Sequence, residues 1–97
     1  MAIVVIQEFS GATLEQYDDV TQRLKLGGNS PAGCLFHVGG MAEGTLRVAE
    51  VWESEGALHT FLGTLGPITQ SMGMAPPKVT VFPVHNILTP ESYKIAF

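Results

Sequence analysis

The chain has 97 residues, of which 45% are hydrophobic and 14% are charged, and its formal net charge is −4. This length suits one domain, and the apolar content excludes an intrinsically disordered chain. Because charged residues make up about 25% of an average protein, we expect a partner chain or a ligand to cover part of the apolar surface.

The charge balance argues against two kinds of partner. Nine Asp and Glu residues outnumber five Lys and Arg residues, and the basic residues are scattered along the sequence. A protein without a basic patch is poorly suited to neutralise the phosphates of nucleic acid or of an anionic membrane surface. We therefore expect no nucleic-acid partner and no membrane partner.

The single cysteine and the first residues bear on where the protein works. Cys34 has no second cysteine with which to pair, which fits a reducing cytoplasm. The first residues lack the basic start of a signal peptide, and no apolar run reaches the roughly 20 residues of a membrane helix. We expect a cytoplasmic protein in which Cys34 is a buried, inert thiol.

The first two predicted elements are a strand and a helix. Residues 3–9 are β-branched and almost continuously apolar, which predicts a strand that is buried on both faces. Thr13 and Gln16 have the spacing of a capping box and predict the start of a helix, which Gly27-Gly28 would end. The apolar side of this helix comprises Leu14, Tyr17, Val20, Thr21 and Leu24.

A hairpin is predicted next. Residues 34–38 and 45–52 read as strands, joined by a flexible turn that begins at Gly39-Gly40. Because successive side chains point to opposite faces of a strand, His37 is expected on the face opposite to Cys34. The same alternation places four residues of the second strand on one face, namely Leu46, Val48, Glu50 and Trp52.

The second half of the chain predicts another helix and a final strand. Ser54 is the expected N-cap, and Gly66-Pro67 is expected to interrupt the helix, with Pro67 opening a short further helix. A strand should start at Lys78, and Pro83 marks it as an edge strand or a bent one. The apolar stripe of the helix comprises Leu58, Phe61, Leu62 and Leu65.

The order β-α-β-β-α-β predicts a ferredoxin-like α+β fold, in which a four-stranded antiparallel sheet carries two helices on one face. Residues 1–88 would form the single domain, and residues 89–97 a tail. The chain has nothing left to cover the other face of the sheet, so we expect a second copy to pack there in a two-fold homodimer. In the tail, Tyr93, Ile95 and Phe97 alternate, as in a short strand that could pack on that partner.

The stretch from Arg47 to His59 carries a resemblance to a known family. A strand that ends in the aromatic Trp52, followed by Ser-x-x-Ala-Leu-His at the start of a helix, resembles the antibiotic-biosynthesis monooxygenase-like domains. The resemblance covers roughly residues 2–88. It implies a dimeric α+β barrel with an apolar pocket between sheet and helices. Members include cofactor-free monooxygenases of aromatic polyketides, quinol monooxygenases and haem-degrading enzymes, and the wider superfamily includes polyketide cyclases.

The haem-degrading branch is the least well matched. It uses an Asn on the first strand, a Trp near the end of the third and a His ligand on the second helix. Trp52 matches, but Gln7 stands where the Asn is needed, and His59 comes earlier in the helix than that branch places it. The histidines also lack the spacing of a metal site. We therefore expect neither haem nor a metal, and no cofactor at all.

Two histidines and five other residues are the candidate site. His37 or His59 could act as a general base, because a neutral imidazole accepts a proton near pH 7. For His37 the sequence favours the alternative of a satisfied histidine in the core or the interface, and His59 is expected at the boundary between core and solvent. Glu50, if buried, needs a partner on another strand or in the other protomer. The candidate substrate-binding residues are Trp52, Gln7, Glu50, Phe61 and Met72.

Two hypotheses about function follow from different classes. The first is an oxidoreductase, a cofactor-independent monooxygenase acting on an aromatic polyketide-like or quinol molecule, or a related cyclase. The second is a non-catalytic homodimer that binds a small apolar molecule. The few polar candidates in the sequence favour the second, and the resemblance favours the first.

Overall fold

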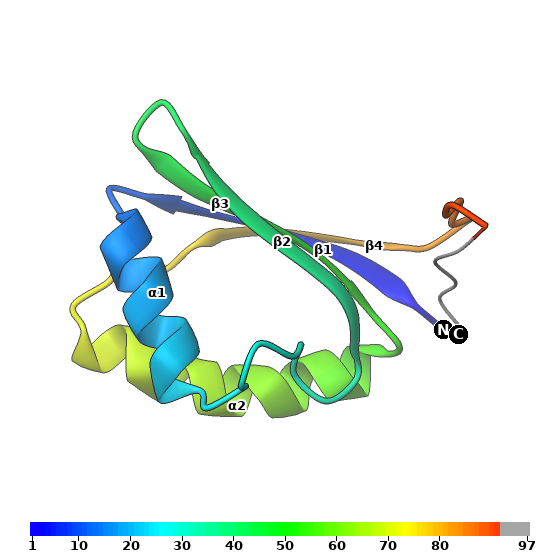
Figure 1. The fold of residues 1–97 in the computed structure, drawn as a ribbon, viewed down its shortest axis with the longest axis horizontal. Coiled ribbons are helices and arrows are strands. Elements are labelled where there is room, and N and C mark those ends of the chain that lie inside the picture. The colour runs from blue at the N-terminus through cyan, green and yellow to red at the C-terminus, as the bar shows by residue number, and fades with distance from the viewer. Residues whose placement is uncertain (92–97) are drawn as a thin grey trace.

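The computed structural model describes residues 1–91 and confirms the predicted order and fold class (Figure 1). The four strands form one antiparallel sheet in the order β2-β3-β1-β4, and both helices lie on the same side of it. The elements are β1 (Ile3–Ser10), α1 (Leu14–Arg23), β2 (Cys34–Ala42), β3 (Thr45–Trp52), α2 (Glu55–Ser71) and β4 (Lys78–Pro83). The predicted alternation at Tyr93, Ile95 and Phe97 lies outside the described residues.

The central strands β1 and β3 are buried mainly on one face, which corrects the expectation for β1. Along β1, buried and partly exposed residues alternate, whereas burial on both faces was expected. The buried side chains point toward the helices, and the others point to the open face of the sheet. The continuous apolar run therefore reflects a second face that nothing in residues 1–91 covers.

Strand β2 differs from its predicted form in two ways. It extends through Gly39 and Gly40 to Ala42, so these glycines lie in the strand and not in the turn. A β-bulge interrupts the pairing with β3 near its start, where Cys34 lies opposite Trp52 but Phe36 lies opposite Val51. Because a bulge inserts one extra residue, it reverses the alternation of side chains that follow.

The bulge corrects the expected position of His37. His37 lies opposite Glu50, and Cys34 lies opposite Trp52. Since Glu50 and Trp52 are two residues apart on a regular strand, their side chains share a face. His37 and Cys34 therefore both lie on the helix side of the sheet. The expectation of opposite faces was wrong because it assumed a strand without a bulge.

Helix α2 is continuous, which corrects the predicted interruption at Gly66-Pro67. Pro67 lies inside the helix, which ends only at Ser71. Both Pro67 and Gly63, whose carbonyl would otherwise accept the missing N–H, are exposed to solvent. The helix tolerates the proline because the unpaired carbonyl faces water. The two predicted N-caps, Thr13 with its capping box and Ser54, are both present.

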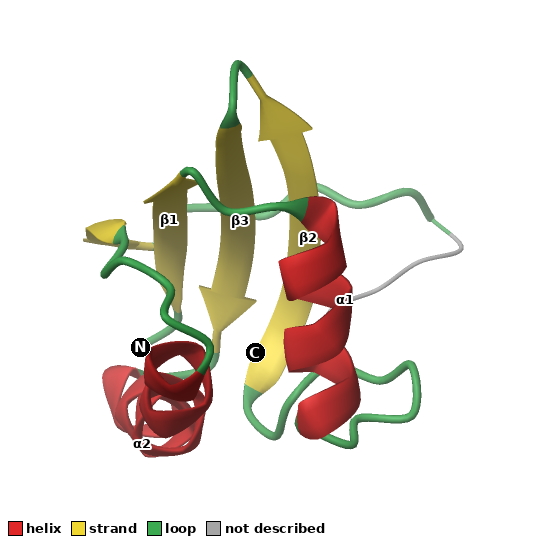
Figure 2. Cartoon of the chain, turned by 90° about the vertical axis from the view of Figure 1, so that its left-hand side faces the viewer, coloured by secondary structure: helices red, strands yellow, loops and turns green. Residues whose placement is uncertain are grey.

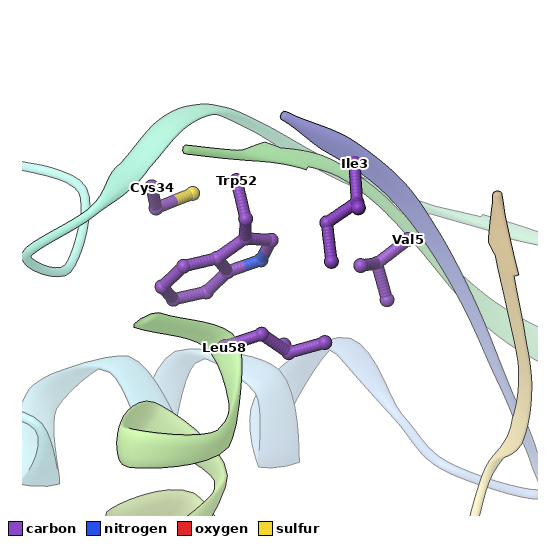
Figure 3. Packing of buried hydrophobic residues seen from close by; sticks show 5 residues of the cluster. All are labelled: Ile3, Val5, Cys34, Trp52 and Leu58. Carbon is purple, nitrogen blue, oxygen red and sulfur yellow. The ribbon is translucent and has the colours of Figure 1, made fainter. Parts of the chain in front are cut away.

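The core consists of two apolar clusters on the helix side of the sheet. In the first, Trp52 packs with four neighbours from β1, β2 and α2, namely Ile3, Val5, Cys34 and Leu58 (Figure 3). Burial and the nearby carboxylate of Glu50 raise the pKa of the Cys34 thiol to about 11. The second cluster comprises Phe9, Ala12, Leu46 and Val48. Within residues 1–91, no helix is long and apolar enough to cross a membrane.

Candidate functional site

A cavity of about 750 Å³ lies between the helix side of the sheet and the two helices. Figure 2 shows α1 and α2 as separate rods, with α2 seen nearly end-on. Residues from the strands, from both helices and from the segment 26–31 line the cavity. Its apolar walls include Phe9, Val48, Phe61 and Leu65. Ligand pockets in proteins commonly have volumes of about 300–1,000 Å³, so the cavity is large enough for a polycyclic molecule.

A cluster of polar groups at the cavity is organised around Glu50, which is only 2% exposed. Its Oε1 accepts hydrogen bonds from Gln7 Nε2 and from Trp52 Nε1, each at 3.2 Å. Its Oε2 lies 2.7 Å from Nδ1 of His37. A carboxylate is purely an acceptor, so three surrounding donors satisfy it in the interior. The cross-strand partner that a buried Glu50 requires is therefore present within one chain.

The sheet register explains why these side chains meet. Gln7, Glu50 and His37 lie on three adjacent strands, β1, β3 and β2. His37 is directly opposite Glu50, and Glu50 is opposite Val5, two residues before Gln7. Directly opposed and diagonal neighbours on one face of a sheet are within reach of long side chains. The bulge in β2 is what turns His37 toward this group.

His37 is held at both ring nitrogens. Because Glu50 accepts at Nδ1, the neutral ring carries its proton there, which leaves Nε2 as an acceptor. The hydroxyl of Tyr17, on α1, lies 2.5 Å from Nε2 and donates to it in that state. The two rings are stacked, with centroids 5.9 Å apart and an angle of 27° between their planes. The result is a chain of hydrogen bonds from Tyr17 through His37 to Glu50.

Tyr17 was missed as a site residue by sequence reasoning, which placed it among the apolar side chains of its helix. Burial raises its pKa, and the negative charges of Glu50 and Asp18 raise it further. Its hydroxyl therefore stays protonated near neutral pH. The one signal in the sequence that could have identified Tyr17 was its phenolic hydroxyl on a largely apolar helix face. A partly buried hydroxyl needs a hydrogen-bond partner, which would lie on the sheet below.

This arrangement has the parts of a general base. A carboxylate at one ring nitrogen of a histidine fixes its tautomer and stabilises the imidazolium that forms when the other nitrogen takes a proton. Glu50 is in this position relative to His37, and Gln7 and Trp52 hold Glu50 in place. The site is thus able to take a proton from a molecule in the cavity.

The other predicted site residues lie in different places. Phe61 lines the cavity. Trp52 is completely buried and packs on Phe61, with ring centroids 5.2 Å apart, so it supports the wall from behind. Met72 is the C-cap of α2 and does not line the cavity, whereas Met74 does. His59 is exposed on α2 and away from the cavity.

Among residues 1–91, no three His, Cys, Asp or Glu side chains are grouped as metal ligands would be. Glu50 and His37 are engaged with each other and with the three neighbours already described. The described part of the cavity offers hydrogen-bonding groups and an apolar surface.

Comparisons with known proteins identify the fold. No family model matches the sequence, and no curated protein matches it significantly. A candidate antibiotic biosynthesis monooxygenase from Chloroflexus aurantiacus superposes with a TM-score of 0.65 at 18% identity, over 92% of this chain and 98% of that chain. A Mycobacterium tuberculosis protein superposes with a TM-score of 0.70 at 18% identity, over 92% of this chain and 100% of that chain.

A third structure has a stated activity. SnoaB, a cofactor-independent oxygenase from Streptomyces nogalater, superposes with a TM-score of 0.66 at 12% identity, over 92% of this chain and 98% of that chain. At these identities the likeness is one of fold. It confirms the predicted resemblance, because the chain has the fold of the antibiotic biosynthesis monooxygenase-like proteins.

Proposed function

We propose that this chain, which has the fold of the antibiotic biosynthesis monooxygenase-like proteins, binds a flat, largely apolar aromatic molecule and removes a proton from it during a cofactor-independent oxidation. The observation that carries the proposal is the buried carboxylate of Glu50, which holds His37 as a base beside an apolar cavity. The description of SnoaB as a cofactor-independent oxygenase supports this reaction class.

The cavity favours a ligand with an aromatic body and one polar edge. Phe9, Val48 and Phe61 offer apolar contacts. Gln7 and the hydroxyl of Tyr17, which is hydrogen-bonded to His37, offer polar ones. Burying a flat hydrocarbon against such walls supplies binding energy of about 25 cal/mol per Å² of apolar surface. The polar cluster then orients the ligand and selects a hydroxyl or an acidic C–H group.

The oxidation requires molecular oxygen and no further reductant. An anthrone illustrates the balance. Its acidic methylene group loses two hydrogens and gains one atom of dioxygen as a carbonyl oxygen, and the second oxygen atom leaves as water. The deprotonated substrate supplies the electrons, and the protein holds the first proton on His37. A base of this kind contributes typically 10²–10⁴-fold to a rate.

We also propose a homodimer that is formed by the open face of the sheet. Val38 on β2 and Phe82 on β4 are 52% and 47% exposed there, on the face opposite to the helices. The partly exposed residues Val4 and Ile6 of β1 lie between them. A contiguous apolar patch on a chain of low charge is typical of an interface, and a two-fold dimer covers the patches of both copies at once.

The oxidation is tested by incubating the protein with an anthrone, with and without oxygen. We expect an oxygen-dependent quinone product, and we expect His37→Ala to lower its rate about 100-fold, because the proton acceptor is removed. His85→Ala is the matched control, since His85 is exposed after β4 and should keep the wild-type rate. His59→Ala tests the other candidate base and should also have little effect.

Three outcomes would contradict the proposal. Product formation at equal rates with and without oxygen would exclude an oxidation by dioxygen. Tight binding without turnover would leave a non-catalytic binding protein. A loss of activity in His59→Ala, with His37→Ala active, would place the base on α2.

A further inference from the structure

The hydrogen bonds of His37 leave a ligand no direct access to its ring nitrogens. Nδ1 is bonded to Glu50 at 2.7 Å, and Nε2 is bonded to the Tyr17 hydroxyl at 2.5 Å. Tyr17 itself lines the cavity. A molecule in the cavity therefore meets the phenolic oxygen of Tyr17 at the point where it would otherwise meet Nε2. A hydroxyl oxygen that donates one hydrogen bond still accepts others.

We propose that Tyr17 is the catalytic group that contacts the ligand, that it relays the ligand's proton to His37, and that the ligand is a phenol. The inference rests on the proposed function, because it uses the same base. As the O–H bond of the ligand breaks, an O–H bond forms on Tyr17, whose own proton moves to Nε2 of His37. The ligand becomes a phenolate, and His37 becomes an imidazolium beside Glu50. No oxidant or reductant takes part in this step.

The surroundings of Tyr17 favour a concerted transfer. Its pKa is raised by burial and by the negative charges of Glu50 and Asp18, so a free tyrosinate is disfavoured. The same carboxylate of Glu50 favours positive charge on His37, at 2.7 Å. After the transfer the ligand carries a negative charge and the imidazole of His37 a positive charge, and Tyr17 is neutral before and after it.

A glycine on β2 positions Tyr17 for this role. A Cβ atom built on Gly39 would lie 2.9 Å from Cε2 of Tyr17 and 3.2 Å from its hydroxyl oxygen. Both distances are too short for an ordinary contact, so a methyl group there would displace the ring from His37. Gly39 is accordingly a positioning residue, which acts through Tyr17 and carries no polar side chain of its own.

The neighbouring glycine provides a matched control. Gly40 lies on the same strand, and apart from its two chain neighbours no described residue has an atom within 4 Å of a Cβ built on it. Neither Gly39 nor Gly40 has a positive φ angle, so alanine fits the backbone at both positions. Gly39→Ala thus places its methyl group against Tyr17, and Gly40→Ala places its methyl group on the open face of the sheet, away from Tyr17.

The test uses 4-nitro-1-naphthol, a flat phenol whose phenolate has a distinct visible absorption band. At a pH where the free probe is mostly neutral, we expect the wild-type protein to bind it as the phenolate. When bound to Tyr17→Phe or Gly39→Ala, the probe should have an acid dissociation constant at least tenfold lower than when bound to the wild-type protein. Bound to Gly40→Ala, it should have the wild-type value. Nitrogen NMR should show Nε2 of His37 becoming protonated on binding in the wild type but not in Tyr17→Phe.

The outcomes separate this inference from the proposed function. If Tyr17→Phe ionises the probe as well as the wild type does, and His37→Ala does not, the relay is wrong but the base on His37 stands. If the wild-type protein binds the probe only as the neutral phenol, both the relay and the base are wrong. Circular dichroism of each variant checks that the fold is retained.

Discussion

At the scale of single residues, one buried carboxylate organises the site. Glu50 lies in the middle of β3 among apolar neighbours, and a charge in such a place must be paired. It receives hydrogen bonds from Gln7, Trp52 and His37, which come from three different strands. The same contacts that satisfy the carboxylate also set the tautomer of His37. Stability and chemistry at this site therefore depend on the same group.

Removing that carboxylate should destabilise the protein. Glu50→Ala leaves the buried donors of Gln7 and Trp52, and the half-buried donor of His37, without their acceptor. Each unsatisfied buried group costs about 1–3 kcal/mol. We expect the free energy of unfolding to fall by about 3 kcal/mol in urea titrations. Glu53→Ala is the control, because Glu53 follows the same strand but is exposed, and it should change stability little. A loss of similar size in both variants would contradict the central role of Glu50.

At the scale of elements, local patterns predicted the strands and helices better than their irregularities. The capping box at Thr13 and Gln16 marks the start of α1 because both partners lie within one turn. The bulge in β2 has no comparable local signal, and it decides that His37 faces the helices. The continuity of α2 through Pro67 also depends on context, since the exposed carbonyls before it are solvated.

The proline in α2 allows a prediction at this scale. Pro67→Ala restores an N–H group that can bond to the carbonyl of Gly63, so we expect the free energy of unfolding to rise by about 1 kcal/mol or more. Pro67→Gly restores the same N–H but adds backbone freedom, and it should be about 1 kcal/mol less stable than Pro67→Ala. Urea denaturation of both variants measures the difference. A less stable Pro67→Ala would show that α2 uses the proline for packing.

At the scale of the whole molecule, the layers divide the protein into a covered side and an open side. Figure 1 shows both helices on one face of the sheet, and the core clusters and the cavity lie on that side. The other face is uncovered within residues 1–91, and it combines an apolar patch with the charged residues Glu8, Arg47 and Lys78. This arrangement accounts for the low charge content that the sequence shows. The apolar residues of the open face, such as Val38 and Phe82, would be covered by a partner and have no need of charge.

The proposed dimer can be tested with a pair of equally exposed residues. Val38 on the open face is 52% exposed, and Leu14 on α1 is 54% exposed. We expect Val38→Asp to shift the protein from dimer toward monomer in light scattering, because it places a charge in the interface. Leu14→Asp should leave the dimer intact. A wild-type protein that is monomeric at micromolar concentration would refute the dimer.

The sequence by itself determined the fold class, the order of elements and the fact that Glu50 and Trp52 share one face of the sheet. These follow from periodicity and capping, which act over a few neighbouring residues. Only the tertiary structure decided that Tyr17 meets His37, and that His59 lies away from the cavity. That outcome depends on a bulge in one strand and on the packing of α1 over Gly39. Contacts of this kind join segments far apart in the chain, so no local pattern records them.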